Sequence, residues 1–549
     1  MTRATRLPLQ VASVLALLVI AGCGAHSQVV RDYESNVDGS LIADDSGIGW
    51  EVVDRFRLVS EPQGTEKLFN RFVSYYGTVS SQINNEGMLE TQWDAAAGRY
   101  RDGYLAVAKW KVKLSFNDAG MCEWRVGAYA PTLAPCRSFV VEVPKGETMV
   151  EVRLGGSNGV IRRTVLRPRD VLIASLGDSY ASGEGVPDLR QYGGWLFWKW
   201  ADAKWMDARC RRSLFSAPGL AALMYAKINP HVSVTHLTYA CSGAKMSEGL
   251  LEEYEGASPP ESAAALRPQV DEFIGDLEKA GRTPDYLTIS AGGNDIGFAD
   301  IVTAAATGSV DDVKKVVKRS VRCGVMSVAE DALTLKAKLD SSRFIRGQTQ
   351  ILLTEYPNPT NLWRLPENSV GIVGTKEEFK EDCAPSKGKI NFVPSAWVLG
   401  MVMQISREEL REINEKVAAP LSDMTTRLAD AVGARRVSGI DEEFRLHGYC
   451  APGLFTPNGI VRWVNTVRDS SRMMGLVKLS GAMHPNIRGQ AAIARHILEK
   501  IRSAECADGK IEEGTPVRAK LCQGDSWRAE LPGFGPGPEP LPASKQFPN

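Results

Sequence analysis

The chain has 549 residues, which is enough for two or three domains of ordinary size. Hydrophobic residues make up 44% of it and charged residues 24%, so it can bury large cores and is not a disordered scaffold. Lys and Arg together number 65, as do Asp and Glu, so the formal net charge is zero. Because a nucleic-acid-binding protein normally carries a basic excess, we expect no nucleic-acid partner.

The N-terminus has the pattern of an export signal. Two arginines precede an apolar run, residues 11–20, that is too short to span a bilayer as a helix. Residues 20–23, Ile-Ala-Gly-Cys, resemble the lipobox of bacterial lipoproteins. This resemblance implies cleavage before Cys23, acylation of that cysteine and a lipid-anchored protein in the bacterial cell envelope. Since Gly24 follows, it also implies the outer membrane in a host with two membranes; an ordinary signal peptide is the alternative.

Hydropathy patterns divide the chain into five parts. A signal peptide of residues 1–22 is followed by a predicted linker, 23–49. Residues 50–167 alternate apolar and polar positions between turn residues, which predicts a small β-rich domain. From 168 to 505 strand and helix patterns alternate, which predicts an α/β domain with a mostly parallel sheet. The C-terminal extension, 506–549, ends in a Pro- and Gly-rich tail that we expect to be disordered.

Within the α/β domain, short apolar runs predict buried parallel strands. These runs are residues 171–176, 232–237, 286–290 and 350–354. Residues 270–277 carry an apolar stripe at helical spacing, with Gly281 placed to end the helix. Ser406 and Glu409 form a capping-box pattern at the start of another helix. Ligands of open parallel sheets bind beyond the carboxyl ends of the strands, so we expect the functional site there.

The ten cysteines predict disulfide bonds, because export leads to an oxidising compartment. No Cys-x-x-Cys pair is present to indicate a zinc or redox site. The candidate pairs are Cys122 with Cys136, Cys506 with Cys522, and Cys210 with Cys241. Cys323, Cys383 and Cys450 are three candidates for one further bond, so one thiol is left over.

Four polar blocks stand out. Three follow predicted strands: residues 177–185 (Gly-Asp-Ser-Tyr-Ala-Ser-Gly-Glu-Gly), 240–244 (Ala-Cys-Ser-Gly-Ala) and 292–295 (Gly-Gly-Asn-Asp). The fourth, residues 483–486 (Met-His-Pro-Asn), precedes a helical pattern. In this order the blocks resemble the SGNH (GDSL-type) hydrolase superfamily, over residues 168–505. The resemblance implies a three-layer α/β sandwich and a serine ester hydrolase.

The resemblance assigns roles to Ser179, Gly243, Asn294 and His484. A serine hydroxyl needs an adjacent base, and His484 can accept the proton of Ser179 and return it to the leaving group. The backbone N–H groups of Ser179 and Gly243 and the side chain of Asn294 are expected to form the oxyanion hole. This chemistry needs no metal or organic cofactor, and we expect none. The likeness to exported bacterial esterases also supports the pairing of Cys210 with Cys241.

One position departs from the family pattern. The family usually carries an acid three residues before the histidine, where this chain has Gly481. We expect the main-chain carbonyl of Gly481 to orient His484, with Asp469 as the other candidate. A catalytically silent binding lipoprotein is the remaining alternative. The histidines at 231, 236, 447 and 496 have no companion ligand set, so we expect them to be surface or packing residues.

Together these features predict an exported, lipid-anchored ester hydrolase that works through an acyl-enzyme. A lipase or carboxylesterase acting on lipid esters is the first expectation, favoured by the exported relatives and by the Trp-rich segment 195–205. A carbohydrate O-acetylesterase acting on cell-envelope polysaccharide is the alternative, with the β-rich domain binding glycan. Lipid esters and acylated glycans are therefore the expected substrates.

Overall fold

The computed structural model describes residues 41, 43–77, 87–154, 159–190, 202–261, 263–360, 405–445, 447–451, 462–474, 479–512, 515–524 and 526–532. The predicted signal peptide, Cys23, Cys383 and the tryptophans of 195–200 lie outside these residues, as does the tail from 533 onward. None of the helices within the described ranges combines the length and apolar character needed to cross a membrane.

A five-stranded parallel sheet forms the centre of the α/β fold. Its spatial order is β11 (Val232–Thr238), β10 (Arg169–Gly177), β12 (Tyr286–Ser290), β13 (Gln350–Thr354) and β14 (Arg435–Val437). The first four are the predicted strands, which form here because their apolar runs are buried on both faces. β14 has only three residues, two of them arginines, so no apolar run marks it in the sequence. The chain leaves β10 in opposite directions toward β11 and β12, which makes the ends of these strands the expected place for a ligand.

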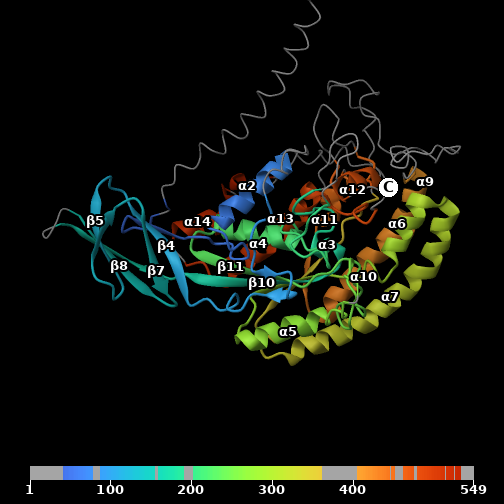
Figure 1. Cartoon of the computed structure of the whole chain (residues 1–549), viewed down its shortest axis with the longest axis horizontal. Helices are drawn as coiled ribbons and strands as arrows, with labels where there is room; N and C mark the ends of the chain where they lie inside the picture. The colour runs from blue at the N-terminus through green and yellow to red at the C-terminus, as the bar shows by residue number, and fades with distance from the viewer. Residues whose placement is uncertain are drawn as a thin grey trace, which may run out of the picture. The chain divides into compact units, whose positions relative to one another are not determined.

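Helices cover both faces of this sheet, giving the predicted three layers (Figure 1). One face is covered by α4 (Ala217–Ile228) and α13 (Ile487–Ala507), which pack against each other. The other face carries α5 (Gln269–Ala280), α7 (Val310–Ser341) and α10 (Ala419–Val432). Gly281 ends α5 in the left-handed conformation, and Ser406 and Glu409 form the capping box of α9 (Arg407–Ile413), both as predicted.

The remaining elements are short or peripheral. The helices are α2 (Gly64–Gly77), α3 (Ser179–Ser182), α6 (Phe298–Thr307), the π-helix η3 (Asn414–Ala418), α11 (Ile440–Phe444), α12 (Val467–Met474), α14 (Pro516–Cys522) and the 3-10 helix η4 (Ser526–Glu530). The strands outside the parallel sheet are β1 (Ile48–Val52), β2 (Trp93–Asp94), β3 (Arg99–Tyr100), β4 (Lys109–Phe116), β5 (Met121–Val126), β6 (Thr132–Pro135), β7 (Phe139–Pro144), β8 (Thr148–Arg153) and β9 (Ile161–Leu166).

The structure distributes residues 50–167 differently from the single β-rich domain that we predicted. The smaller of two compact units includes residues 113–140 and 149–164, with most of the four-stranded sheet β6-β5-β8-β9. Residues 52–112 belong instead to the larger unit, which holds the parallel sheet, and they include the 14-residue helix α2. The buried hydroxyls of Tyr100 and Tyr104 donate to main-chain oxygens of β11. Apolar alternation predicts that a side chain is buried, but it does not say in which core.

Candidate active site

The serine of the first block lies where β10 turns into helix α3. Asp178 caps this short helix, because its carboxylate accepts the N–H of Tyr180 at 3.0 Å. The preceding Gly177 has a φ of +142°, and a Cβ there would overlap the main-chain oxygen of Ser290. Only glycine fits this position, so the tight passage from strand to helix follows from the local sequence. The turn leaves Ser179 at the carboxyl end of β10.

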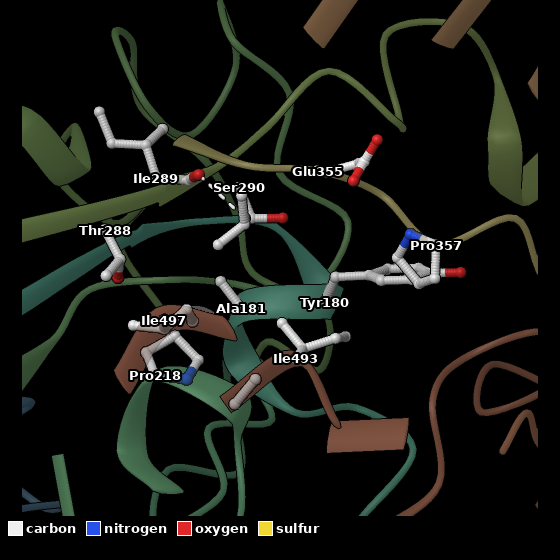
Figure 2. A pocket seen from close by; sticks show the side chains of 12 residues that line it. Tyr180, Ala181, Pro218, Thr288, Ile289, Ser290, Glu355, Pro357, Ile493 and Ile497 are labelled. Carbon is white, nitrogen blue, oxygen red and sulfur yellow. Dashed lines mark hydrogen bonds between the residues drawn. The ribbon is translucent and has the colours of Figure 1, made fainter. Parts of the chain in front are cut away.

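Helix α3 packs closely against α4 and α13 (Figure 2). Ala181 of α3 faces Pro218 of α4 and Ile493 and Ile497 of α13. The space between them is about 10 Å³, which is at the limit of a single water molecule. Tight packing on this side leaves helix α3, and with it Ser179, little freedom to move.

Ser179 and His484 are in hydrogen-bonding contact. His484 Nε2 lies 2.7 Å from Ser179 Oγ, the distance required between a nucleophile and its general base. The hydroxyl of Tyr180, the residue after the serine, donates to the main-chain oxygen of Met483 at 2.8 Å. Burial lowers the pKa of His484 below its ordinary value, so the imidazole is neutral near pH 7 and able to accept a proton.

The group that orients His484 is a main-chain carbonyl, but it is not the predicted one. His484 Nδ1 lies 3.0 Å from the oxygen of Ala482. The oxygen of Gly481 instead accepts the backbone N–H of His484 at 3.3 Å. Met483, between them, has a φ of +65°, and this turn directs the Ala482 carbonyl toward the imidazole ring. Our expectation of Gly481 therefore named the right kind of group on the wrong residue.

The other candidate, Asp469, is engaged elsewhere. Its carboxylate accepts a bond from Arg462 at 2.7 Å and from the backbone N–H of Thr466 at 3.0 Å. Burial raises the pKa of Asp469, but the charge of Arg462 and these hydrogen bonds outweigh burial, and the pKa is lowered overall. Asp469 thus holds the start of α12 rather than His484.

The predicted oxyanion-hole residues come from three loops that bond to one another. The N–H of Cys241 donates to the oxygen of Gly177 at 2.9 Å, and Asn294 Nδ2 donates to the oxygen of Ala244 at 2.9 Å. Gly243 has a φ of +85°, and a Cβ there would overlap the Tyr254 hydroxyl, so this position also requires glycine.

Two main-chain donors remain available beside the serine. In the part of the chain that the structure describes, neither the N–H of Ser179 nor that of Gly243 has a hydrogen-bond acceptor. The Asn294 amide uses one of its two hydrogens on Ala244. Free N–H groups at a nucleophile are what a developing oxyanion requires.

Sequence reasoning missed Tyr356, which braces the first block. Its hydroxyl donates to the carboxylate of Asp178 and accepts the N–H of Gly293 at 3.2 Å. Burial raises the pKa of Asp178 to about 7, although the bond from Tyr356 opposes this rise. Tyr356 follows β13 at its carboxyl end, so the rule that located the other blocks also points to it.

The two aspartates of the blocks, Asp178 and Asp295, support loops. Asp178 caps α3, and the carboxylate of Asp295 accepts the N–H of Met246 at 3.1 Å. Burial raises the pKa of Asp295 to about 6. Both carboxylates are thus held by hydrogen bonds, and the hydrogen bond of Ser179 Oγ is to His484.

The structure confirms the three candidate disulfides. They join Cys122 to Cys136, Cys210 to Cys241, and Cys506 to Cys522. Cys450 is also disulfide-bonded, and Cys323 is a free, exposed thiol. No group of three or more His, Cys, Asp or Glu side chains within the described ranges is arranged to hold a metal ion.

The sequence matches no known family model and no curated protein. Among solved structures it is similar to an extracellular lipase from Streptomyces rimosus, with 19% identity, a TM-score of 0.35 and coverage of 60% of this chain and 99% of the lipase. A phospholipase A1 from Streptomyces albidoflavus gives 16% identity, a TM-score of 0.35 and coverage of 60% and 98%. A carbohydrate acetylesterase from Sinorhizobium meliloti gives 11% identity, a TM-score of 0.26 and coverage of 60% and 98%. The three-layer α/β architecture and the meeting of the four blocks at the carboxyl ends of its strands agree with the SGNH-type hydrolase fold that those blocks indicated.

Proposed function

We propose that this protein is a serine ester hydrolase that works through an acyl-enzyme on Ser179. The observation that carries this proposal is the 2.7 Å contact between Ser179 Oγ and His484 Nε2. It lies beside two backbone N–H groups, of Ser179 and Gly243, that have no acceptor among the described residues. A nucleophile, a base and free oxyanion donors together support acyl transfer.

The geometry supports the following order of events. Ser179 Oγ attacks the ester carbonyl while His484 Nε2 takes the hydroxyl proton, and the carbonyl oxygen becomes an oxyanion. The N–H groups of Ser179 and Gly243 and the free amide hydrogen of Asn294 stabilise that charge. His484 then gives its proton to the leaving alcohol. Water, activated by the same histidine, hydrolyses the acyl-enzyme and regenerates Ser179. The Ala482 carbonyl keeps the other ring hydrogen on Nδ1 throughout.

A lipase or carboxylesterase activity on lipid esters is the first candidate for the substrate class. It is supported by the likeness of the sequence blocks to those of exported bacterial esterases. The tryptophans at 195–200, which favoured this reading in the sequence, lie outside the described residues.

A cavity of about 430 Å³ favours the second candidate, deacetylation of carbohydrates. Phe298 and Tyr356 line it, and both also contact the catalytic region. The Phe298 ring centroid lies 6.2 Å from that of His484, and Tyr356 bonds to Asp178. The polar part of the lining consists of Asn358, Thr360, Asn414, Ser422, Asp423 and Asp441. Amides, hydroxyls and carboxylates beside apolar surface suit the hydroxyls and ring faces of a sugar better than an alkyl chain, and the carboxylates disfavour a lipid phosphate.

The test of the hydrolase proposal is turnover of p-nitrophenyl esters from acetate to palmitate, with Ser179→Ala as the matched variant. We expect turnover that is lost in Ser179→Ala. A preference for acetate, with acetate release from acetylated oligosaccharides, would select the carbohydrate substrate; a preference for long chains would select the lipid. If no ester is cleaved and Ser179 does not react with a fluorophosphonate, the hydrolase proposal is wrong and the silent binding protein remains.

We also propose that a lipid on Cys23 anchors the protein in the bacterial cell envelope. The lipobox-like residues 20–23 support this. Mass spectrometry of the N-terminal peptide from bacterially expressed full-length protein should show diacylglycerol on Cys23, and Cys23→Ala should leave the membrane fraction. An unmodified N-terminus created by cleavage elsewhere would contradict the anchor.

A further inference from the structure

We propose that the buried Glu184 and the half-buried Arg211 form a charged pair that holds the three catalytic loops together, with Glu184 supplying the negative charge that is missing at Gly481. This inference rests on the proposed hydrolase function and adds to it two positioning residues. Neither touches the reacting atoms, so both act through Ser179, Gly243 and His484.

Glu184 belongs to the same block as the nucleophile and is almost fully buried, with 1% of its surface exposed. One carboxylate oxygen accepts a bond from Arg211 Nη1, and the other accepts the hydroxyl of Ser242. Ser242 directly precedes Gly243, so this carboxylate ties the nucleophile loop to the oxyanion loop. A buried carboxylate is tolerated only when it is paired in this way, which makes the two contacts obligatory for the fold of the site.

Arg211 extends the same network to the histidine loop. Its Nη1 also donates to Ser480 Oγ at 2.5 Å, four residues before His484. The other guanidinium nitrogens donate to Ser258 Oγ at 3.3 and 3.2 Å. Through Glu184 and Arg211, the loops that carry Ser179, Gly243 and His484 are therefore joined by side-chain hydrogen bonds.

The backbone of Arg211 shows that its position is enforced. Its φ is +52°, a left-handed conformation that is unfavourable for a residue with a Cβ. The neighbour Cys210 is bonded to Cys241, and the N–H of Ser242 donates to the oxygen of Cys210 at 3.0 Å. The disulfide thus joins the backbone beside Arg211 to the backbone beside Ser242, the two residues that bind Glu184.

The charge of Glu184 acts on His484. Burial lowers the pKa of His484, the Glu184 carboxylate opposes that effect, and the Arg211 guanidinium adds to it. The charges of Glu184 and Arg211 thus act on the imidazole with opposite signs, and the rings of Tyr180 and Phe298 are its aromatic neighbours. Since the partner of Nδ1 among the described residues is the uncharged Ala482 carbonyl, Glu184 is the negative charge that stabilises the imidazolium formed when Ser179 loses its proton.

The test compares the charge-removing variants Glu184→Gln and Arg211→Gln. Glu184→Gln should lower kcat at least about tenfold with a smaller change in KM, since the stabilised charge exists only after proton transfer. It should also move the acid limb of the pH profile of kcat/KM to lower pH, because removing the carboxylate lowers the pKa of His484. Arg211→Gln should move that limb to higher pH. A purely structural role would lower activity in both variants without shifting the limb in opposite directions.

Glu505 provides a matched control at the other end of the sheet. Its side chain is 0% exposed and pairs with Arg169, the first residue of β10. Glu505→Gln should reduce stability and leave the acid limb unchanged. Glu184→Asp, which keeps the charge, should keep the limb near its original pH even if the rate falls. If Glu184→Gln and Glu505→Gln have the same effect on the pH profile, the proposal is overturned.

An independent readout separates this proposal from the hydrolase function itself. The titration of His484 can be followed by NMR of protein labelled at histidine Cε1, with His484→Asn identifying the signal. Glu184→Gln should lower the pKa of His484 and Arg211→Gln should raise it, whether or not any ester is cleaved. Unchanged pKa values in both variants would refute the electrostatic role even if ester turnover is present.

Discussion

Two buried histidines of the larger unit have similar surroundings on one side of the ring and different ones on the other. His236, on β11, places Nδ1 3.1 Å from the oxygen of Ile173, much as His484 places Nδ1 3.0 Å from that of Ala482. His484 Nε2 lies 2.7 Å from Ser179 Oγ, whereas His236 Nε2 has no hydrogen-bond partner within the described part of the chain.

The pKa values follow the same division. Burial lowers the pKa of His236 to about 4, with only the bond to the Ile173 oxygen opposing it. Burial also lowers the pKa of His484, but there the Glu184 carboxylate opposes the effect. A carbonyl at Nδ1 is therefore common to both histidines. The hydroxyl at Nε2 and a nearby buried charge are what set apart His484, the proposed general base.

The largest expected effect comes from the same substitution at both histidines. Asparagine can keep the Nδ1-side bond to the carbonyl but removes Nε2. His484→Asn should lower kcat/KM for a p-nitrophenyl ester by about 10⁴-fold or more, because Ser179 loses its base. His236→Asn should change it by less than about threefold. Comparable losses in the two variants, with both folded by circular dichroism, would remove the distinction between the two sites.

A smaller effect is expected at the oxyanion hole. Asn294→Ala deletes one donor while the N–H groups of Ser179 and Gly243 remain. We expect kcat to fall by about 10²–10³-fold with little change in KM, because the lost bond forms to the oxyanion and not to the ground-state ester. Steady-state kinetics on the acetate ester will check this, and an unchanged kcat would place Asn294 outside the hole.

The smallest effects concern how the free energy of unfolding depends on pH. The contributions of Asp178 and His236 have opposite signs. The pKa of Asp178 is raised to about 7, so the folded state holds its proton more tightly and its contribution to stability is lost as pH rises from about 4 to 7. The pKa of His236 is lowered to about 4, so its contribution is present above about 6.5 and is lost as pH falls. Each group changes the free energy of unfolding by at most about 1.4 kcal/mol per pH unit.

Urea unfolding of Asp178→Asn and His236→Asn at pH 4.5, 5.5 and 6.5 isolates these two contributions. Relative to wild type, Asp178→Asn should become more stable as pH rises. The wild type loses stability when Asp178 loses its proton, whereas the asparagine side chain has no such proton to lose. His236→Asn should become relatively more stable as pH falls. Differences that do not vary with pH would show that neither group has a shifted pKa in the folded protein.

Local pattern predicted much of the fold, and the resemblance of four short blocks to a known family pointed to the four principal site residues. Apolar runs located four of the five strands of the parallel sheet, since a strand buried on both faces has few polar positions. The chain order of the blocks then placed Ser179, Gly243 and Asn294 at strand ends, where the structure brings their loops together with His484. The strand positions were confirmed because they depend on residues adjacent in sequence.

Contacts between distant residues were decided only by the tertiary structure. The oxygen that orients His484 belongs to Ala482 rather than Gly481, because Met483 adopts a left-handed backbone conformation. A methionine in the sequence does not predict that conformation. Glu184 meets Arg211, and Tyr356 meets Asp178, only after separate loops pack together. Residues 52–112 join the core of the parallel sheet although their alternation is also that of an independent β-domain. Composition and periodicity determine which side chains are buried, whereas the partner each one finds depends on how the whole chain packs.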